Sequence, residues 1–311
     1  MNFKHTPVLS AEVITYLNPQ PNKNFIDCTL GGGGHAAEIL KLTGPKGKLL
    51  GIDLDPKAIK ASQENLKKYK ERIILVNDNY KNLKNICYDS GFNQIDGILL
   101  DLGLSSFELQ DQERGFSFKG SSCLDMRFGD GHKTAAQIIN NYREEDLARI
   151  FKNYGEEKFA RQIAREIVKE RKMQRIITTD QLVNVIERVY RNKIKPKRIH
   201  FATKVFQALR IEVNDEINNL RTILPVALDS LKKGGRIVVI SFHSLEDRIV
   251  KNFFRDEAKT CICPPKIPVC QCNHQPSLKI LTKKPISPGL SEIRINPRSR
   301  SAKLRAAIKI I

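Results

Sequence analysis

The chain has 311 residues, enough for one large domain or two smaller ones. Lysine and arginine number 53 against 34 acidic residues, and the net charge of +19 favours a polyanionic partner, most commonly a nucleic acid, over a basic surface that has no partner. The sequence contains no apolar run long enough to cross a membrane and no apolar signal segment at its start. We therefore expect a cytoplasmic protein whose cysteines form no disulfides.

The first hundred residues alternate between strand and helix patterns. Helices are predicted over 34–42 and from Asp55-Pro56, an N-cap followed by proline, to about residue 70. Apolar runs predict strands at 24–30, 48–53, 72–76 and 95–101. Because strands that alternate with helices form parallel sheets with crossover helices, we expect an α/β domain.

Strand patterns stop between residues 108 and 210. Helices are predicted over 156–172, from Thr178 or Thr179 onward, and over 201–211. In the first of them, the face opposite the apolar one carries five basic residues: Lys158, Arg161, Arg165, Lys169 and Lys172. We expect an all-helical domain of residues 108–210, inserted into an α/β domain of residues 1–107 and 211–311.

The α/β pattern resumes after the predicted insertion. Residues 215–231 have the pattern of a helix, and RIVVIS at 236–241 has the pattern of a buried strand. The segments 278–281 and 302–310 predict two closing strands.

Four consecutive glycines, Gly31 to Gly34, lie between the first predicted strand and the first predicted helix. Glycines at such a junction let a nucleotide-like ligand reach the backbone N–H groups, although a plain tight turn uses the same residues. Asp53 ends the second strand about 20 residues later, where a carboxylate can accept hydrogen bonds from ribose hydroxyls.

Two further carboxylates belong to the same pattern. Asp27 lies just before the glycines, where it would repel a pyrophosphate but would suit the ammonium or sulfonium of S-adenosylmethionine; a turn-forming carboxylate is the alternative interpretation. Asp101 ends the fourth strand. Because ligands of open α/β sheets bind beyond the carboxyl ends of the strands, we expect Asp27, Asp53 and Asp101 to converge on one site.

These and other segments together resemble the bacterial ribosomal RNA small-subunit methyltransferase H family. The similar segments are TLGGGGHA, DGILLDLGLSS, ERGFSF, LDMR, YGEEKFARQIA, FQALRIEVNDE, SFHSLEDRIVK and NPRSRSAKLR. The resemblance implies a Rossmann-like, class I methyltransferase sheet with an inserted helical substrate-recognition domain. It also implies S-adenosylmethionine-dependent methylation of cytidine N4 in the decoding region of 16S ribosomal RNA, with that RNA or the assembling 30S particle as partner.

The resemblance further implies a set of cofactor contacts. They are Gly33, Gly34, His35, Asp53, Tyr80, Asp101 and Glu108. Tyr80 replaces the more usual phenylalanine, and Glu108 replaces the more usual glutamine, so Glu108 can accept a hydrogen bond but cannot donate one. The alternative for His35 is a solvent-facing residue at the start of a helix.

Asp101 is also the best candidate for the acceptor that activates the cytidine amine. Ser241 and His243 follow the RIVVIS strand and are further catalytic candidates, although His243 could instead order the loop toward Glu246 and Asp247. Two other functions are considered. One is a DNA amino-methyltransferase, whose catalytic tetrapeptide differs from Asp101-Leu-Gly-Leu, and the other is a non-catalytic ribosome-assembly factor that binds RNA.

A cluster of cysteines is a candidate metal site, and several basic segments are candidate phosphate contacts. Cys261-x-Cys263 and Cys270-x-Cys272 could bind a structural zinc, although C-x-C is narrower than the usual spacing; a free-thiol or redox-sensitive loop is the alternative. For phosphate contacts we expect the basic helix face described above together with the Arg188–Arg198 segment, Arg298, Arg300 and Arg305.

Overall fold

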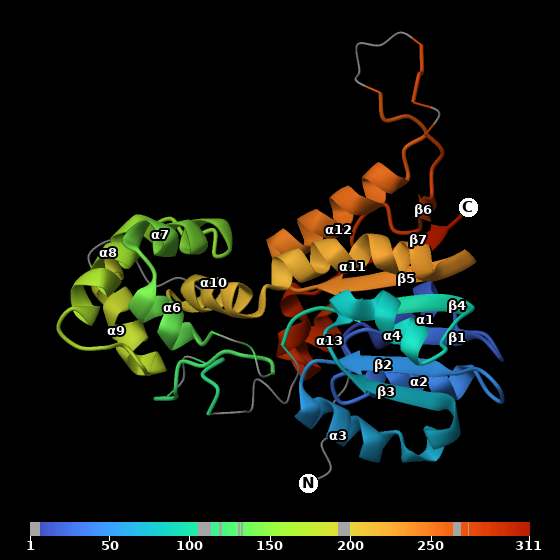
Figure 1. Ribbon diagram of the computed structural model, residues 1–311, viewed down its shortest axis with the longest axis horizontal. Coiled ribbons are helices and arrows are strands. Elements are labelled where there is room, and N and C mark those ends of the chain that lie inside the picture. The colour runs from blue at the N-terminus through green and yellow to red at the C-terminus, as the bar shows by residue number, and fades with distance from the viewer. Residues whose placement is uncertain are drawn as a thin grey trace. The chain divides into compact units, whose positions relative to one another are not determined.

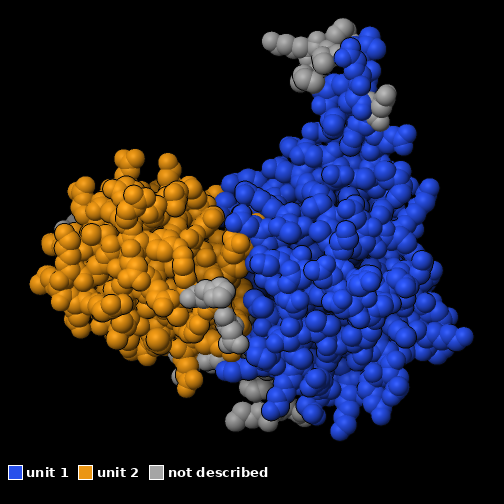
Figure 2. Space-filling model, in the orientation of Figure 1, with its two compact units in different colours: residues 1–103, 218–311 blue, residues 104–217 orange. Residues whose placement is uncertain are grey.

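The computed structural model describes residues 7–104, 113–117, 120–129, 131, 133–191, 200–263, 269–272 and 274–311. The chain divides into two compact units (Figure 2). Unit 1 comprises residues 1–103 and 218–311, and unit 2 comprises residues 104–217. Within the described ranges, no helix has the length and the apolar character needed to cross a membrane.

Unit 1 is built on a seven-stranded sheet with the order β3-β2-β1-β4-β5-β7-β6 (Figure 1). The strands are β1 (Asn24–Asp27), β2 (Leu49–Asp53), β3 (Ile73–Asn77), β4 (Ile95–Asp101), β5 (Leu231–Ser241), β6 (Leu278–Ile280) and β7 (Lys303–Lys309). The strands β1 to β5 are parallel, and β7 runs antiparallel to both of its neighbours. This sheet confirms the predicted Rossmann-like, class I α/β fold, and its strand order reverses between β1 and β4.

Helices cover both faces of this sheet. They are α1 (Ser10–Leu17), α2 (Gly34–Leu42), α3 (Pro56–Asn65), α4 (Leu83–Asp89), α11 (Glu216–Ser230), α12 (Ser244–Glu257) and α13 (Leu290–Ile295), with 3-10 turns η1 (Lys67–Arg72), η2 (Tyr80–Asn82) and η3 (Pro297–Ser301). The bounds of α2 agree with the prediction. Helix α3 begins as predicted, because the Asp55 side chain accepts a hydrogen bond from the Lys57 N–H, but it ends at Asn65 rather than near residue 70.

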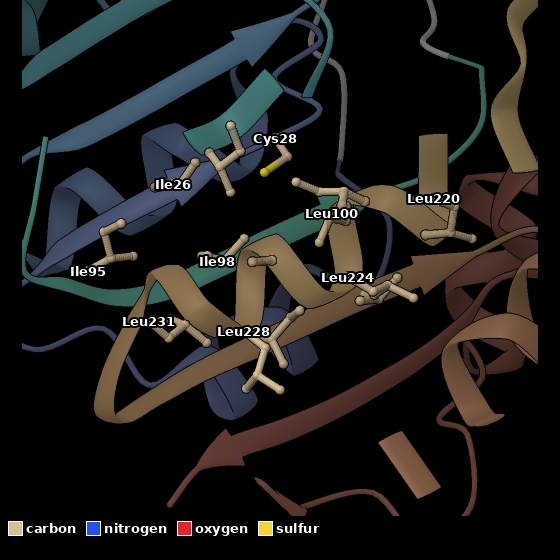
Figure 3. Packing of buried hydrophobic residues seen from close by; sticks show 14 of the residues in the cluster. Ile26, Cys28, Ile95, Ile98, Leu100, Leu220, Leu224, Leu228 and Leu231 are labelled. Carbon is tan, nitrogen blue, oxygen red and sulfur yellow. The ribbon is translucent and has the colours of Figure 1, made fainter. Parts of the chain in front are cut away.

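Neighbouring residues of each central strand pack into two different hydrophobic clusters. Ile26 and Ile98 belong to the cluster that includes α4, α11 and α12, where Leu224 of α11 lies over the strands (Figure 3). Phe25 and Leu99 belong to the cluster on the other face, with α1, α2 and α3. Both faces of the sheet are therefore buried. This burial explains why the strands are continuous apolar runs whose polar residues lie at their ends.

Unit 2 is helical and has its own hydrophobic core. Its helices are α6 (Ala135–Asn141), α7 (Glu144–Asn153), α8 (Ala160–Arg171), α9 (Thr179–Tyr190) and α10 (Thr203–Asn214). Phe151, Ile163, Leu182 and Leu209 are buried together in that core. Helix α8 begins at Ala160, later than in the predicted helix over 156–172: Glu156 has the left-handed backbone conformation (φ 47°), and the Phe159 N–H donates to the Glu157 side chain (2.9 Å).

Candidate active site

Three carboxylates end three neighbouring strands of the sheet. Asp27 is the last residue of β1, Asp53 the last of β2, and Asp101 the last of β4. Because these strands are parallel and adjacent, the three residues lie along one edge of the sheet, at the point where the strand order reverses. Open α/β sheets bind their ligands at this point. The structure thus brings the three acids close enough together for the charges of Asp53 and Asp101 to act on Asp27.

The loop after β1 holds these strand ends together. The Thr29 N–H donates to Asp27 Oδ1 (3.2 Å), and the Asp101 N–H donates to the hydroxyl oxygen of Thr29 (2.6 Å). The Gly31 N–H donates to Asp53 Oδ2 (2.8 Å). The loop thus bridges β1 to β2 and to β4 and fixes the orientation of two carboxylates. Thr29 was missed in the sequence; the turn itself could have been expected, because an aspartate side chain commonly accepts a hydrogen bond from the backbone N–H two residues later.

The glycines of the loop are required by its conformation and its packing. Gly33 has φ +77°, and a Cβ atom there would lie 2.8 Å from Leu66 Cδ1. A Cβ atom on Gly34 would lie 2.7 Å from Pro7 Cγ. A side chain at either position would therefore displace neighbouring residues and with them the start of α2. The glycines allow a tight loop, and the loop in turn presents its backbone at the ends of the strands.

Helix α3 supports the same loop from the side. The Ser62 hydroxyl donates to the Gly31 carbonyl (2.8 Å), and the Asn65 amide donates to the Gly32 carbonyl (3.0 Å). The sequence prediction did not include either of these supporting residues. Both residues lie in or at the end of α3, and the sequence predicted only where that helix begins and ends. No local pattern therefore indicated that its side chains would contact the glycine loop.

His35, at the start of α2, is buried rather than solvent-facing, so the alternative interpretation of this residue is wrong. Its Nε2 lies 3.5 Å from Asp101 Oδ2. Burial lowers the pKa of His35, but the nearby Asp101 carboxylate and the charge of Asp27 outweigh it, so the pKa is raised above its usual value. The two carboxylates thus make the protonated imidazole more favourable than it is in a free histidine.

Two carboxylate oxygens of the site are buried, and no described residue donates a hydrogen bond to either of them: Asp27 Oδ2 and Asp101 Oδ1. Burial raises the pKa of Asp27 to about 7, against the opposing effects of His35 and the Thr29 N–H. Burial likewise raises the pKa of Asp53 to about 6. Unsatisfied buried carboxylates are costly. The site therefore fits a ligand that brings a positive charge and hydrogen-bond donors, as S-adenosylmethionine would.

Of the remaining predicted cofactor contacts, one lies on the same edge of the sheet. Tyr80 begins η2, a few residues after the end of β3, and its ring packs against the hydrophobic cluster of α4 and α11. Glu108 lies outside the described residues.

The two further catalytic candidates follow β5. Ser241 is buried at the end of that strand, and its hydroxyl donates to the Lys303 carbonyl (3.3 Å). His243 is the N-cap of α12: its Nδ1 accepts a hydrogen bond from the Glu246 N–H (3.4 Å), while the Glu246 carboxylate accepts one from the Phe242 N–H (2.8 Å). The structure therefore shows that His243 orders this loop.

The predicted basic face of α8 is present. Ile163 and Ile167 are buried, whereas Arg161, Arg165 and Lys169 are exposed on the other side of the helix. Lys158 and Lys172, just outside the helix, are exposed as well. Arg165 forms one ion pair, with Glu144 (3.8 Å). Lys158, Arg161, Arg165, Lys169 and Lys172 are hereafter called the α8 basic face.

The other predicted phosphate contacts have different outcomes. Arg298 and Arg300 are exposed in η3. Arg188 pairs with Glu170, and residues 192–199 of the adjoining basic segment lie outside the described residues. The prediction for Arg305 is wrong: this side chain is buried in β7, where its Nε donates to Asp247 Oδ1 (2.7 Å). A guanidinium used in this way cannot contact a phosphate.

Comparison with known proteins agrees with this architecture. A model of the MraW methylase family matches residues 2–310. The ribosomal RNA small subunit methyltransferase H of Heliobacterium mobile is 48% identical over 312 residues, with 100% of both chains covered. Proteins of the same name from Finegoldia magna and Clostridium botulinum are 45% and 49% identical, also over 100% of both chains. The predicted family resemblance is thereby confirmed: the chain is a methyltransferase and belongs to the MraW methylase family.

Proposed function

We propose that the chain transfers a methyl group from S-adenosylmethionine to the N4 amine of a cytidine in the decoding region of 16S ribosomal RNA. The observation that carries this proposal is the set of three strand-end carboxylates, two oxygens of which are buried and accept no hydrogen bond from a described residue. A module that only binds RNA gains nothing from such acids, because they repel phosphate. The names of the relatives support the class of RNA.

The cofactor supplies a methyl group on a positively charged sulfonium. We assign the ribose hydroxyls to Asp53 and the positively charged end to Asp27, whose Oδ2, at the end of β1, accepts no hydrogen bond from the residues described. Tyr80, which begins η2 shortly after the end of β3, would contact the adenine. The backbone of Gly33, Gly34 and His35 would line the cofactor, and Glu108 would accept a hydrogen bond from it.

Asp101 is the residue that would assist the methyl transfer. The lone pair of cytosine N4 is delocalised into the ring, so attack requires the amine to become pyramidal. An acceptor for an N4–H favours this change and stabilises the positive charge that develops on nitrogen. Asp101 Oδ1 is buried and has no described donor, while Oδ2 faces His35. Ser241 and His243 are the next candidates to contact the substrate, from the end of β5.

The RNA is assigned to the helical insertion, residues 108–210, and in particular to the α8 basic face. Its exposed cations can neutralise phosphates, and none of them is a residue of the proposed cofactor site. The substrate is the small-subunit RNA, free or in an assembling 30S particle. The reaction would take place in the bacterial cytoplasm, where ribosomal subunits assemble.

Labelled methyl transfer tests the proposal against both alternatives. The protein is incubated with methyl-labelled S-adenosylmethionine and, separately, with unmethylated 30S subunits, naked 16S RNA and DNA. We expect label in a ribosomal RNA substrate and none in DNA. Label in DNA would favour a DNA amino-methyltransferase. Binding of RNA without binding of S-adenosylmethionine, measured by calorimetry, would favour a non-catalytic assembly factor.

A further inference from the structure

The segment between α12 and β6 projects from unit 1 and carries four of the seven cysteines (Figure 1). Its base is closed by the Ser277 N–H, which donates to the Glu257 carbonyl (3.0 Å). No described residue from 259 to 272 belongs to a hydrophobic cluster, and Ile262 and Val269 are 57% and 70% exposed. Burial of apolar side chains therefore does not hold the described residues of this segment in place, and small segments without a hydrophobic core usually need a crosslink or a metal.

The sulfur atoms of Cys261, Cys263, Cys270 and Cys272 all lie within 4.8 Å of one another. Cys272 Sγ lies 3.5 Å from Cys270 Sγ and 3.7 Å from Cys261 Sγ. A tetrahedral zinc with Zn–S bonds of about 2.3 Å separates its sulfur ligands by roughly 3.8 Å. The spacing fits a shared ion, whereas a disulfide would require about 2.05 Å. The narrow C-x-C motif is therefore no obstacle, because it places two sulfurs at the required separation.

Backbone N–H groups point at three of these sulfurs. The Ile262 N–H donates to Cys272 Sγ, the Cys263 N–H to Cys261 Sγ and the Gln271 N–H to Cys263 Sγ, each at 3.4 Å. A neutral thiol is a weak acceptor, so such donors are used best when the sulfur is a thiolate. Four thiolates around one divalent ion carry a net negative charge, which these donors offset. Thus the backbone is arranged for a metal thiolate centre.

We propose that Cys261, Cys263, Cys270 and Cys272 form a structural zinc site that holds the segment between α12 and β6. When Zn²⁺ binds, the four thiols lose their protons to solvent and four Zn–S bonds form, with no change of oxidation state. All four tetrahedral positions are filled by protein sulfur, so no position remains for water or substrate. The site therefore stabilises structure and takes no part in methyl transfer.

Metal analysis of the full chain tests this proposal. After expression with zinc and purification under reducing conditions, the protein should contain about one zinc per chain. Cys270→Ser and Cys272→Ser should lose the zinc, whereas Cys123→Ser, a matched change at an exposed cysteine of unit 2, should retain it. Replacement of zinc by Co²⁺ should give the charge-transfer and visible bands of a tetrahedral tetrathiolate centre.

A measurement on the unaltered chain covers the case in which the serine variants fail to fold. A mercurial thiol reagent should release the zinc as it titrates the thiols, and trypsin should then cleave between residues 258 and 277 faster than before. Reduced protein without metal, or with disulfides that form readily in its place, would overturn the proposal. Zinc retained in Cys270→Ser, or iron instead of zinc, would also overturn it. None of these outcomes bears on methyl transfer.

Discussion

Replacement of Asp27 by Asn should stabilise the protein without cofactor, and more strongly at high pH than at low pH. The carboxyl of Asp27 has a pKa of about 7 in the folded chain against an ordinary value of 3.8, so the folded state binds its proton more tightly than the unfolded state does. Stability is therefore lost as the pH rises from 3.8 to about 7, and the loss is complete above that range. A difference of about three pKa units corresponds to about 4 kcal/mol.

Asn cannot ionise, yet its amide oxygen can still accept the hydrogen bond from the Thr29 N–H. The free energy of unfolding of Asp27→Asn relative to the unaltered protein should thus rise by a few kcal/mol, up to about 4, between low pH and pH 8. Urea unfolding without cofactor at pH 5 and pH 8 measures the part of this change that falls above pH 5, which is about 3 kcal/mol. The cost of burying the amide does not depend on pH, so it cancels when the stability differences at the two pH values are compared.

The same variant should bind S-adenosylmethionine more weakly. A charge-assisted contact is worth about 1.5–3 kcal/mol, so affinity at pH 8 should fall by about 10- to 150-fold. If Asp27 faces the sulfonium, S-adenosylhomocysteine, which lacks that charge, should be affected much less; if Asp27 faces the ammonium, both ligands should be affected. For the unaltered protein, affinity should rise as the pH rises through about 7, because the ligand requires the ionised carboxylate.

Asp96→Asn is the matched control. Asp96 lies at the opposite end of β4, where it pairs with Lys23 and Lys232. Its replacement should leave the affinity for S-adenosylmethionine unchanged. Two results would refute the reasoning about Asp27: a stability difference that is the same at pH 5 and pH 8, or an unchanged affinity for both ligands.

Three further predictions concern the cofactor, the chemistry and the RNA. Asp53→Asn should weaken S-adenosylmethionine binding about tenfold in calorimetry, the difference between a charge-assisted and a neutral hydrogen bond, and unchanged affinity would remove the ribose assignment. Asp101→Asn should lower the single-turnover rate by about 10²–10³-fold, with both affinities within about tenfold; a normal rate at saturation would make Asp101 only a ligand contact. Arg161→Ala with Arg165→Ala should lower the slope of log affinity against log salt by about 0.7–0.9 for each phosphate that the variant no longer neutralises, and an identical slope would make the α8 basic face a solvated surface.

Much of the sheet could be predicted because its signals are local. The apolar runs that end in Asp53 and Asp101 are buried on both faces, so each is a strand whose polar terminus marks the edge of the sheet. Helix α2 lies between a glycine and Thr43, and both ends were correct. Helices α6 and α7 were missed, although the capping box of Thr134 and Gln137 marks the start of α6.

The rest depended on residues that are distant in the sequence. His35 is buried, and its ring approaches Asp101 of β4, 66 residues later in the sequence, which no local pattern reveals. Arg305 was expected on a basic surface, because its segment is basic, but it pairs with an aspartate 58 residues away. The basic residues along the sequence therefore indicated that the whole chain has a positive net charge, but they did not indicate which group an individual arginine contacts.

In the proposed function, the strand-end carboxylates serve the methylation of a cytidine amine in small-subunit RNA. This function is tested most directly by nucleoside mass spectrometry of unmethylated 30S subunits after incubation with S-adenosylmethionine that carries a trideuterated methyl group. We expect labelled N4-methylcytidine with the unaltered protein and with Asp96→Asn, and a much slower appearance of it with Asp101→Asn. Label on another atom or base, or equal rates for Asp101→Asn and the unaltered protein, would contradict this proposal.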